Sequence, residues 1–92
     1  MKNWKEIENF LRSEFIGEKI KVVEAKNRTL EGLEGEIYWE TKNTFEIKTE
    51  RGIKRIPKSG TVFLFQSQKL KVDGDVLLGR PEERLKKRYK YW

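Results

Sequence analysis

Two consecutive runs of alternating apolar and polar residues, between positions 33 and 50, constrain the fold of this chain more than any other feature. The apolar positions are Leu33, Gly35, Ile37 and Trp39 in the first run and Phe45, Ile47 and Thr49 in the second. A period of two gives a strand one apolar face and one solvated face. The pattern therefore predicts two half-buried antiparallel strands joined as a hairpin.

Directly opposed residues of a hairpin share a face, which restricts how these two strands pair. Trp39 must then lie opposite an apolar residue of the second run, Phe45 or Ile47, and not opposite Glu46. A loop of two residues would place Trp39 opposite Glu46, so this pairing requires a loop with an odd number of residues. We therefore predict a three-residue loop at 41–43, with Asn43 in the left-handed backbone region that Asn tolerates.

Further short strands are expected at 18–25, 53–56, 61–66 and 69–73, separated by Gly-containing or polar turns. In the last of these, Leu70 and Val72 face inward, while Lys69 and Lys71 face outward. Gly35 falls at an inward position, which indicates a sharp bend or a close backbone crossing. Five to six short strands joined by tight turns predict an all-β core, a small closed or nearly closed antiparallel barrel.

Short amphipathic helices are predicted on both sides of the barrel, so that residues 1–16 and 79–92 flank a β-barrel at 17–78. The apolar faces of these helices are formed by Trp4, Ile7 and Leu11 at the N-terminus and by Leu85, Tyr89 and Trp92 at the C-terminus. At the spacing of one helical face, each set either caps the barrel or docks a partner protein.

The composition of the 92 residues favours a single domain and restricts its chemistry. Cys and His are absent, which excludes disulfides, thiolate metal sites and the commonest general base. No segment has the length of a membrane span or the apolar run of a signal peptide, so we expect a cytoplasmic protein. Charged residues make up 39%, which is typical of proteins from thermophiles.

The net charge of +6 is unevenly distributed along the chain. Residues 51–92 hold twelve basic and four acidic side chains, whereas 17–50 hold six basic and eight acidic, and 1–16 are balanced. A localised basic excess indicates a polyanionic partner such as a nucleic acid, although a solvated surface is the alternative.

The order and spacing of several short motifs resemble archaeal ribonuclease P protein component 1. These motifs are Gly35-x-Ile37-x-x-Glu40-Thr41-x-Asn43-Thr44, then Pro57-Lys58, Phe63 and Arg80-Pro81-Glu82-x-Arg84, with Ile16-Gly17, Val22-Val23 and Leu30-x-Gly32 before them. The resemblance covers roughly residues 16–84. Trp39 departs from it, because the family usually has a smaller or polar residue there.

This resemblance implies an Sm-like, SH3-type barrel with terminal helices. It also implies a non-catalytic RNA-binding subunit of the ribonucleoprotein that removes 5′ leaders from precursor tRNA. In that family the RNA performs the cleavage with Mg²⁺, and the protein chain itself binds no cofactor. The implied partners are the specificity domain of the catalytic RNA, a small zinc-ribbon subunit (component 4) and, indirectly, precursor tRNA.

RNA contacts of such a barrel are expected to be mainly phosphate contacts made by cations of its later half. The candidates are Lys42, Asn43, Arg51, Lys54, Arg55, Lys58, Lys69, Lys71, Arg80 and Arg84. Arg84 has an alternative role, which is to pair with Glu40. For a partner protein the candidates are Trp4, Ile7, Leu11, Leu85, Tyr89 and Trp92. Tyr38 is the aromatic residue of the barrel most expected to be exposed.

Two other functions compete with RNA binding in ribonuclease P. The first is a ribosomal or chromatin-associated SH3-type barrel, which has a similar composition but does not require the two family motifs. The second is a metal-dependent nuclease that uses Glu34, Glu36 and Glu40, since two-metal chemistry needs clustered carboxylates. These three residues alternate on one strand, which is more typical of a solvated barrel exterior.

Overall fold

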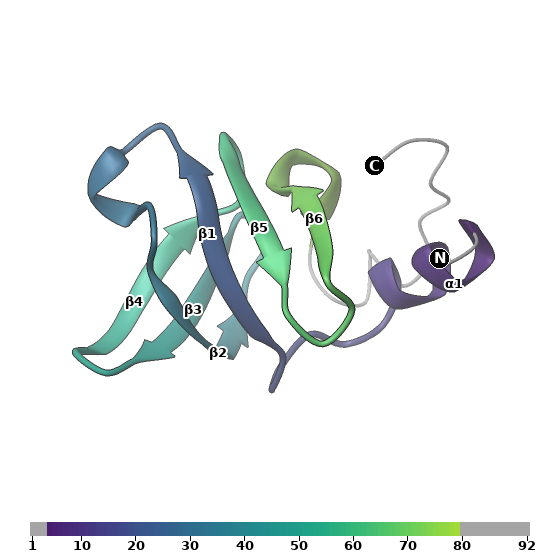
Figure 1. Cartoon of the computed structure of the whole chain (residues 1–92), viewed down its shortest axis with the longest axis horizontal. Helices are drawn as coiled ribbons and strands as arrows, with labels where there is room; N and C mark the ends of the chain where they lie inside the picture. The colour runs from purple at the N-terminus through teal and green to yellow at the C-terminus, as the bar shows by residue number, and fades with distance from the viewer. Residues whose placement is uncertain (1–3, 80–92) are drawn as a thin grey trace.

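The computed structural model describes residues 4–79 of the chain, except the side chain of Trp4 (Figure 1). Its elements are α1 (Trp4–Leu11), β1 (Lys19–Ala25), η1 (Arg28–Leu30), β2 (Glu34–Glu40), β3 (Thr44–Thr49), β4 (Gly52–Pro57), β5 (Thr61–Phe65), β6 (Leu70–Asp73) and η2 (Gly74–Leu77). The predicted C-terminal helix lies outside the described residues. All the predicted strands are confirmed, whereas the two short 3₁₀ helices η1 and η2 were not expected.

The six strands form one antiparallel sheet in the order β4-β3-β2-β1-β5-β6. Within the described residues β4 and β6 are its outer strands, so the all-β fold is confirmed but the sheet is not closed by hydrogen bonds. The sheet is nevertheless strongly curled, as Figure 1 shows. The rings of Phe45 on β3 and Phe63 on β5 lie 5.2 Å apart, although two strands separate them in the sheet. In a flat sheet three strand spacings would hold them about 14 Å apart.

The core fills the inside of this curl and is covered at one end by the N-terminal segment. Phe15 is fully buried between Phe65, at 4.8 Å between ring centroids, and Phe45, at 6.1 Å. Ile7 and Leu11 of α1 are buried in the same cluster. Ile7 and Leu11 therefore cap the barrel, which is one of the two predicted alternatives. They do not form a free docking surface.

Gly35 lies at a close backbone crossing, as its inward position predicts. It pairs with Ile20 of β1, and a Cβ built on it would lie 2.5 Å from the carbonyl oxygen of Lys48 on β3. Because glycine has no Cβ, β3 approaches β2 closely at this point.

The hairpin predicted at 33–50 is confirmed as β2 and β3, but its register differs from the predicted one. Ile37 lies opposite Ile47, whereas Trp39 lies opposite Glu46 and Glu40 opposite Phe45. Between Ile37 and Trp39, β2 advances by two residues while β3 advances by one, which is a β-bulge.

The bulge reverses the predicted orientation of the residues that follow it. Trp39 is 53% exposed instead of packed in the core, and Glu40 is 4% exposed instead of outward. The strand bounds leave residues 41–43 as the connection, as predicted. Lys69 is the non-glycine residue with positive φ in the described part of the chain, so the left-handed conformation expected for Asn43 is wrong.

Candidate nucleic-acid interface

The described basic candidates lie in three separate places on the curled sheet. Lys42 and Asn43 are exposed between β2 and β3, and Arg51, Lys54 and Arg55 are exposed at the turn into β4 and along that strand. Lys69 and Lys71 are exposed at the turn before β6 and on β6, at the other edge of the sheet. These candidates therefore come from three different parts of the sheet.

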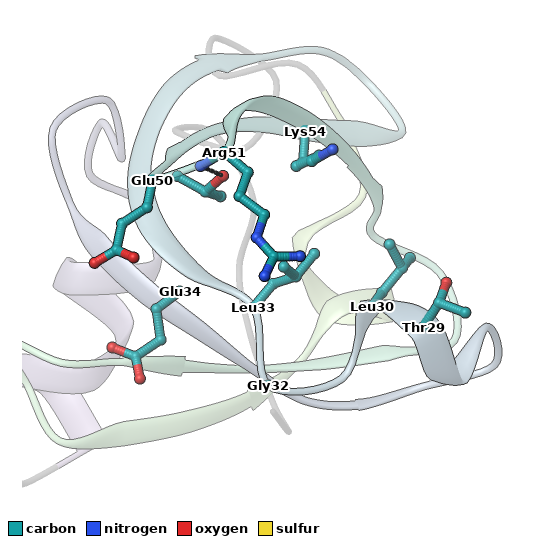
Figure 2. Close-up of a pocket in the computed structure, with 9 residues that line it drawn as sticks. Thr29, Leu30, Gly32, Leu33, Glu34, Glu50, Arg51 and Lys54 are labelled. Atoms are coloured by element: carbon teal, nitrogen blue, oxygen red, sulfur yellow. Dashed lines mark hydrogen bonds between the residues drawn. The ribbon is translucent and has the colours of Figure 1, made fainter.

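An open groove of about 610 Å³ lies beside the β3–β4 turn (Figure 2). Its floor includes Leu30 and Leu33, and the side chain of Arg51 extends from the turn toward Leu33. Lys54 lines another side of the groove, while Glu34 and Glu50 lie together at one end. The groove thus combines an apolar floor with two exposed cations and two exposed carboxylates.

The turn that carries Arg51 is tightly organised by Thr49. Thr49 pairs with Gly52, so Glu50 and Arg51 are the two residues of the turn. The hydroxyl of Thr49 accepts a hydrogen bond from the Arg51 N–H at 3.2 Å and donates to the Gly52 carbonyl at 2.7 Å. A two-residue turn at the end of paired strands fixes the backbone from which the Arg51 side chain projects.

Arg55 differs from its neighbours because it has a carboxylate partner on the adjacent strand. Its Nη2 donates to Oε1 of Glu46 at 3.3 Å, and the arginine side chain is largely exposed. Such an exposed ion pair contributes at most about 1 kcal/mol to stability. Contact with a phosphate would require Arg55 to share or exchange this partner.

The β2–β3 connection is closed by its two threonines. The Thr44 N–H donates to the Thr41 hydroxyl at 3.1 Å, and the Thr41 N–H donates to the Thr44 carbonyl at 3.0 Å. These bonds leave Lys42 and Asn43 at the tip, where both are exposed. The tip and the Arg51 turn lie at opposite ends of β3, roughly 17 Å apart for a six-residue strand.

Lys58 is not an exposed candidate, because the structure buries its side chain completely. Its Nζ lies 2.7 Å from Oε2 of Glu40, whose side chain is also inaccessible. A direct RNA contact by Lys58 is therefore inconsistent with this fold. The sequence pattern predicts both residues as surface charges, because it does not reveal the bulge that turns Glu40 inward.

The three carboxylates of the nuclease hypothesis are not brought together. Glu40 is bound to Lys58, whereas Glu34 is exposed, 3.8 Å from Lys21 and 3.4 Å from the amide of Gln66. Glu36 is exposed as well. Within residues 4–79 no cluster of three or more acidic side chains has the arrangement of a metal site.

Tyr38 is exposed, as expected, and Trp39 beside it is exposed as well, at 55% and 53% respectively. Both stand at the bulge of β2, where the change of register turns Trp39 outward. An exposed pair of aromatic side chains is a surface on which a base or a partner side chain can pack.

Several candidates fall outside the described residues: Arg80, Arg84, Leu85, Tyr89, Trp92 and the side chain of Trp4. The pairing of Arg84 with Glu40 also lies beyond them. None of the helices in residues 4–79 combines the length and the apolar character that a membrane span needs.

Comparison with known proteins relates this chain to protein subunits of ribonuclease P. The family described as ribonuclease P/MRP, subunit p29, matches residues 8–87. "Ribonuclease P protein component 1" of Methanocaldococcus jannaschii is 53% identical over 85 residues, covering 89% of this chain and 90% of that protein. The protein of the same name from Methanosphaera stadtmanae is 42% identical, covering 89% and 91%.

A solved structure is similar to this chain in fold as well as in sequence. It is described as "Structure of Mth11: A homologue of human RNase P protein Rpp29". The similarity covers 78% of this chain and 97% of that one, with a TM-score of 0.57 and 33% sequence identity.

Proposed function

Because this chain belongs to the ribonuclease P/MRP subunit p29 family, we propose that it is a non-catalytic RNA-binding subunit of ribonuclease P. In this role it supports the catalytic RNA during 5′ maturation of precursor tRNA. The observation that carries the proposal is the family match over residues 8–87, together with relatives of that name that align over about nine-tenths of both chains.

The surface chemistry of the described residues is compatible with this role. Arg51 and Lys54 stand on a two-residue turn and on a paired strand, so that their backbone positions are fixed before RNA binds. Folded RNA presents phosphates and 2′-hydroxyls across shallow grooves, and cations on a rigid frame recognise this shape. A ribosomal or chromatin-associated barrel would use similar cations, but the family match favours ribonuclease P.

The partners of the chain follow from this proposal. We infer that it binds the specificity domain of the catalytic RNA, associates with the zinc-ribbon subunit (component 4) and contacts precursor tRNA indirectly. Mg²⁺ acts at the catalytic RNA and not on this chain, and the complex works in the cytoplasm. Trp4, Leu85, Tyr89 and Trp92 remain the candidates for the protein partner.

Affinity for the catalytic RNA, measured across a series of salt concentrations, tests the proposed RNA binding. Replacing Arg51 and Lys54 with Ala should weaken binding and lower the slope of log affinity against log salt by about 1 per lost phosphate contact. The matched control replaces Lys19 and Lys48, which are exposed cations outside the candidate set. Equal losses in both variants would indicate a general effect of net charge and not a contact surface.

A cleavage assay separates this proposal from the nuclease alternative. The purified chain with Mg²⁺ and precursor tRNA should produce no cleavage unless the catalytic RNA is added. Cleavage by the protein alone that is abolished by Glu34→Gln would contradict the non-catalytic role.

A further inference from the structure

The side chain of Lys58 is the centre of a buried cluster that joins three segments of the chain. Its Nζ donates to Oε2 of Glu40 at 2.7 Å and to the carbonyl oxygens of Thr41 and Gly79, both at 2.9 Å. The carbonyl oxygen of Lys42 lies at 3.4 Å. We call Lys58, Glu40 and these three carbonyl groups the Lys58 cluster.

Backbone contacts connect the same three segments. The Gly79 N–H donates to the Lys42 carbonyl at 2.8 Å, and the Lys58 N–H donates to the Asn43 carbonyl at 2.8 Å. Gly74, in η2, packs so closely on the Lys58 carbonyl that a side chain there would overlap it. The hairpin tip, the turn after β4 and the segment from Gly74 to Gly79 therefore form one tightly packed unit.

A buried ammonium group is an expensive way to hold this unit together. Removing a charge from water costs several kcal/mol, and apolar side chains of similar volume commonly replace a buried ion pair without loss of stability. An apolar side chain, however, makes no directed contact with carbonyl oxygens. What Lys58 adds beyond stability is the fixed position of the carbonyl groups of Thr41, Lys42 and Gly79, since it donates to them from one point.

The groups held by the cluster border on candidate RNA contacts. Lys42 and Asn43 are exposed at the tip, and Gly79 is followed directly in the chain by Arg80. Residues 80–92 contain six basic and two acidic side chains. The Lys58 cluster thus fixes Gly79, the residue that precedes this basic segment in the sequence, beside the hairpin tip.

We infer that Lys58 and Glu40 are positioning residues for RNA binding. They hold the hairpin tip and Gly79 in fixed positions, so that Lys42 and Asn43 meet the phosphate backbone of the RNA in one orientation. The inference rests on the proposed function, and it assigns a role in recognition to two side chains that never touch the RNA.

The test separates position from stability by using three variants and the ribonuclease P RNA. Lys58→Met removes the donor and leaves the Glu40 carboxylate buried, whereas the double variant Glu40→Leu with Lys58→Met removes both charges. Leu70→Ala, in β6, creates a cavity away from the cluster and serves as the control for destabilisation alone. Circular dichroism establishes that each protein is folded at the temperature of the binding measurement.

We expect the double variant to recover the stability that Lys58→Met loses but not the RNA affinity, which should stay about tenfold below that of the unchanged protein. Leu70→Ala should bind RNA like the unchanged protein. Exchange of the Gly79 amide hydrogen should accelerate in the double variant, because the carbonyl groups around it are no longer fixed.

Two results would overturn the inference in distinguishable ways. If the double variant binds RNA as tightly as the unchanged protein, or retains full protection of the Gly79 amide, the cluster serves stability only and the proposed function stands. If the unchanged protein itself fails to bind ribonuclease P RNA, the proposed function fails and the inference fails with it.

Discussion

Replacing Lys58 with Met should be one of the most destabilising single substitutions in this chain. The change removes the ammonium group that contacts Glu40 at 2.7 Å and leaves a carboxylate on a side chain that solvent does not reach. Breaking a buried ion pair by removing one partner costs about 3–5 kcal/mol. A small domain has a total stability of about 5–15 kcal/mol, so the substitution removes a large share of it.

The loss can be expressed as a melting temperature and measured directly. For a domain of this size, 1 kcal/mol corresponds to a shift of roughly 4–8 °C, so we expect the midpoint to fall by roughly 12–40 °C. Urea unfolding followed by far-ultraviolet circular dichroism gives the free energy independently. Lys69→Met is the matched control, because Lys69 is exposed and should change stability by no more than about 0.5 kcal/mol.

The double variant distinguishes the ion pair from other effects at this site. Glu40→Leu combined with Lys58→Met removes both charges of the pair, so its stability should return to within about 1–2 kcal/mol of that of the unchanged protein or exceed it. A loss below about 1 kcal/mol for Lys58→Met alone would refute the reasoning, because the Glu40 carboxylate would then be satisfied without the lysine.

Three further substitutions test the packing and register of the sheet by chemical denaturation. Gly35→Ala places a Cβ 2.5 Å from the Lys48 carbonyl oxygen and should cost about 1–3 kcal/mol, and a neutral result would contradict the close crossing of β2 and β3. Trp39→Ala should cost less than about 1 kcal/mol because Trp39 is 53% exposed. A loss of about 3–5 kcal/mol, the size expected for a buried aromatic residue, would show that Trp39 faces the core after all. Leu11→Ala should cost about 2–5 kcal/mol because Leu11 is fully buried in the core, and a loss below about 1 kcal/mol would contradict the packing of α1 on the sheet.

Much of the fold could be predicted from local patterns. The alternation in β2 and β3 located the central hairpin, and the inward position of Gly35 indicated a close crossing that the structure shows against Lys48. These predictions succeed because a period of two and the lack of a Cβ are properties of the local sequence.

The orientation of Trp39 and Glu40 could not be predicted in the same way. A bulge inserts one residue without changing composition, and every side chain after it then faces the other side of the sheet. The left-handed backbone expected for Asn43 fails for the same reason, because the loop was derived from strands paired without a bulge. The threonines at 41 and 44 close the turn instead.

The candidate site was only partly predictable because exposure depends on tertiary contacts. Lys is rarely buried, so the sequence predicts Lys58 at the surface, whereas its partner Glu40 lies 18 residues away at the end of β2. The sequence also shows that basic residues accumulate after position 50, but not that Arg51 and Lys71 lie on opposite edges of the sheet.

Crosslinking between protein and RNA in the assembled ribonuclease P particle tests the central claim most directly. Ultraviolet crosslinks, mapped to residues by mass spectrometry, should connect the RNA to the hairpin tip at Lys42 and Asn43 and to the groove beside Arg51. The account is contradicted if the chain assembles into the particle but no RNA crosslink falls on either place.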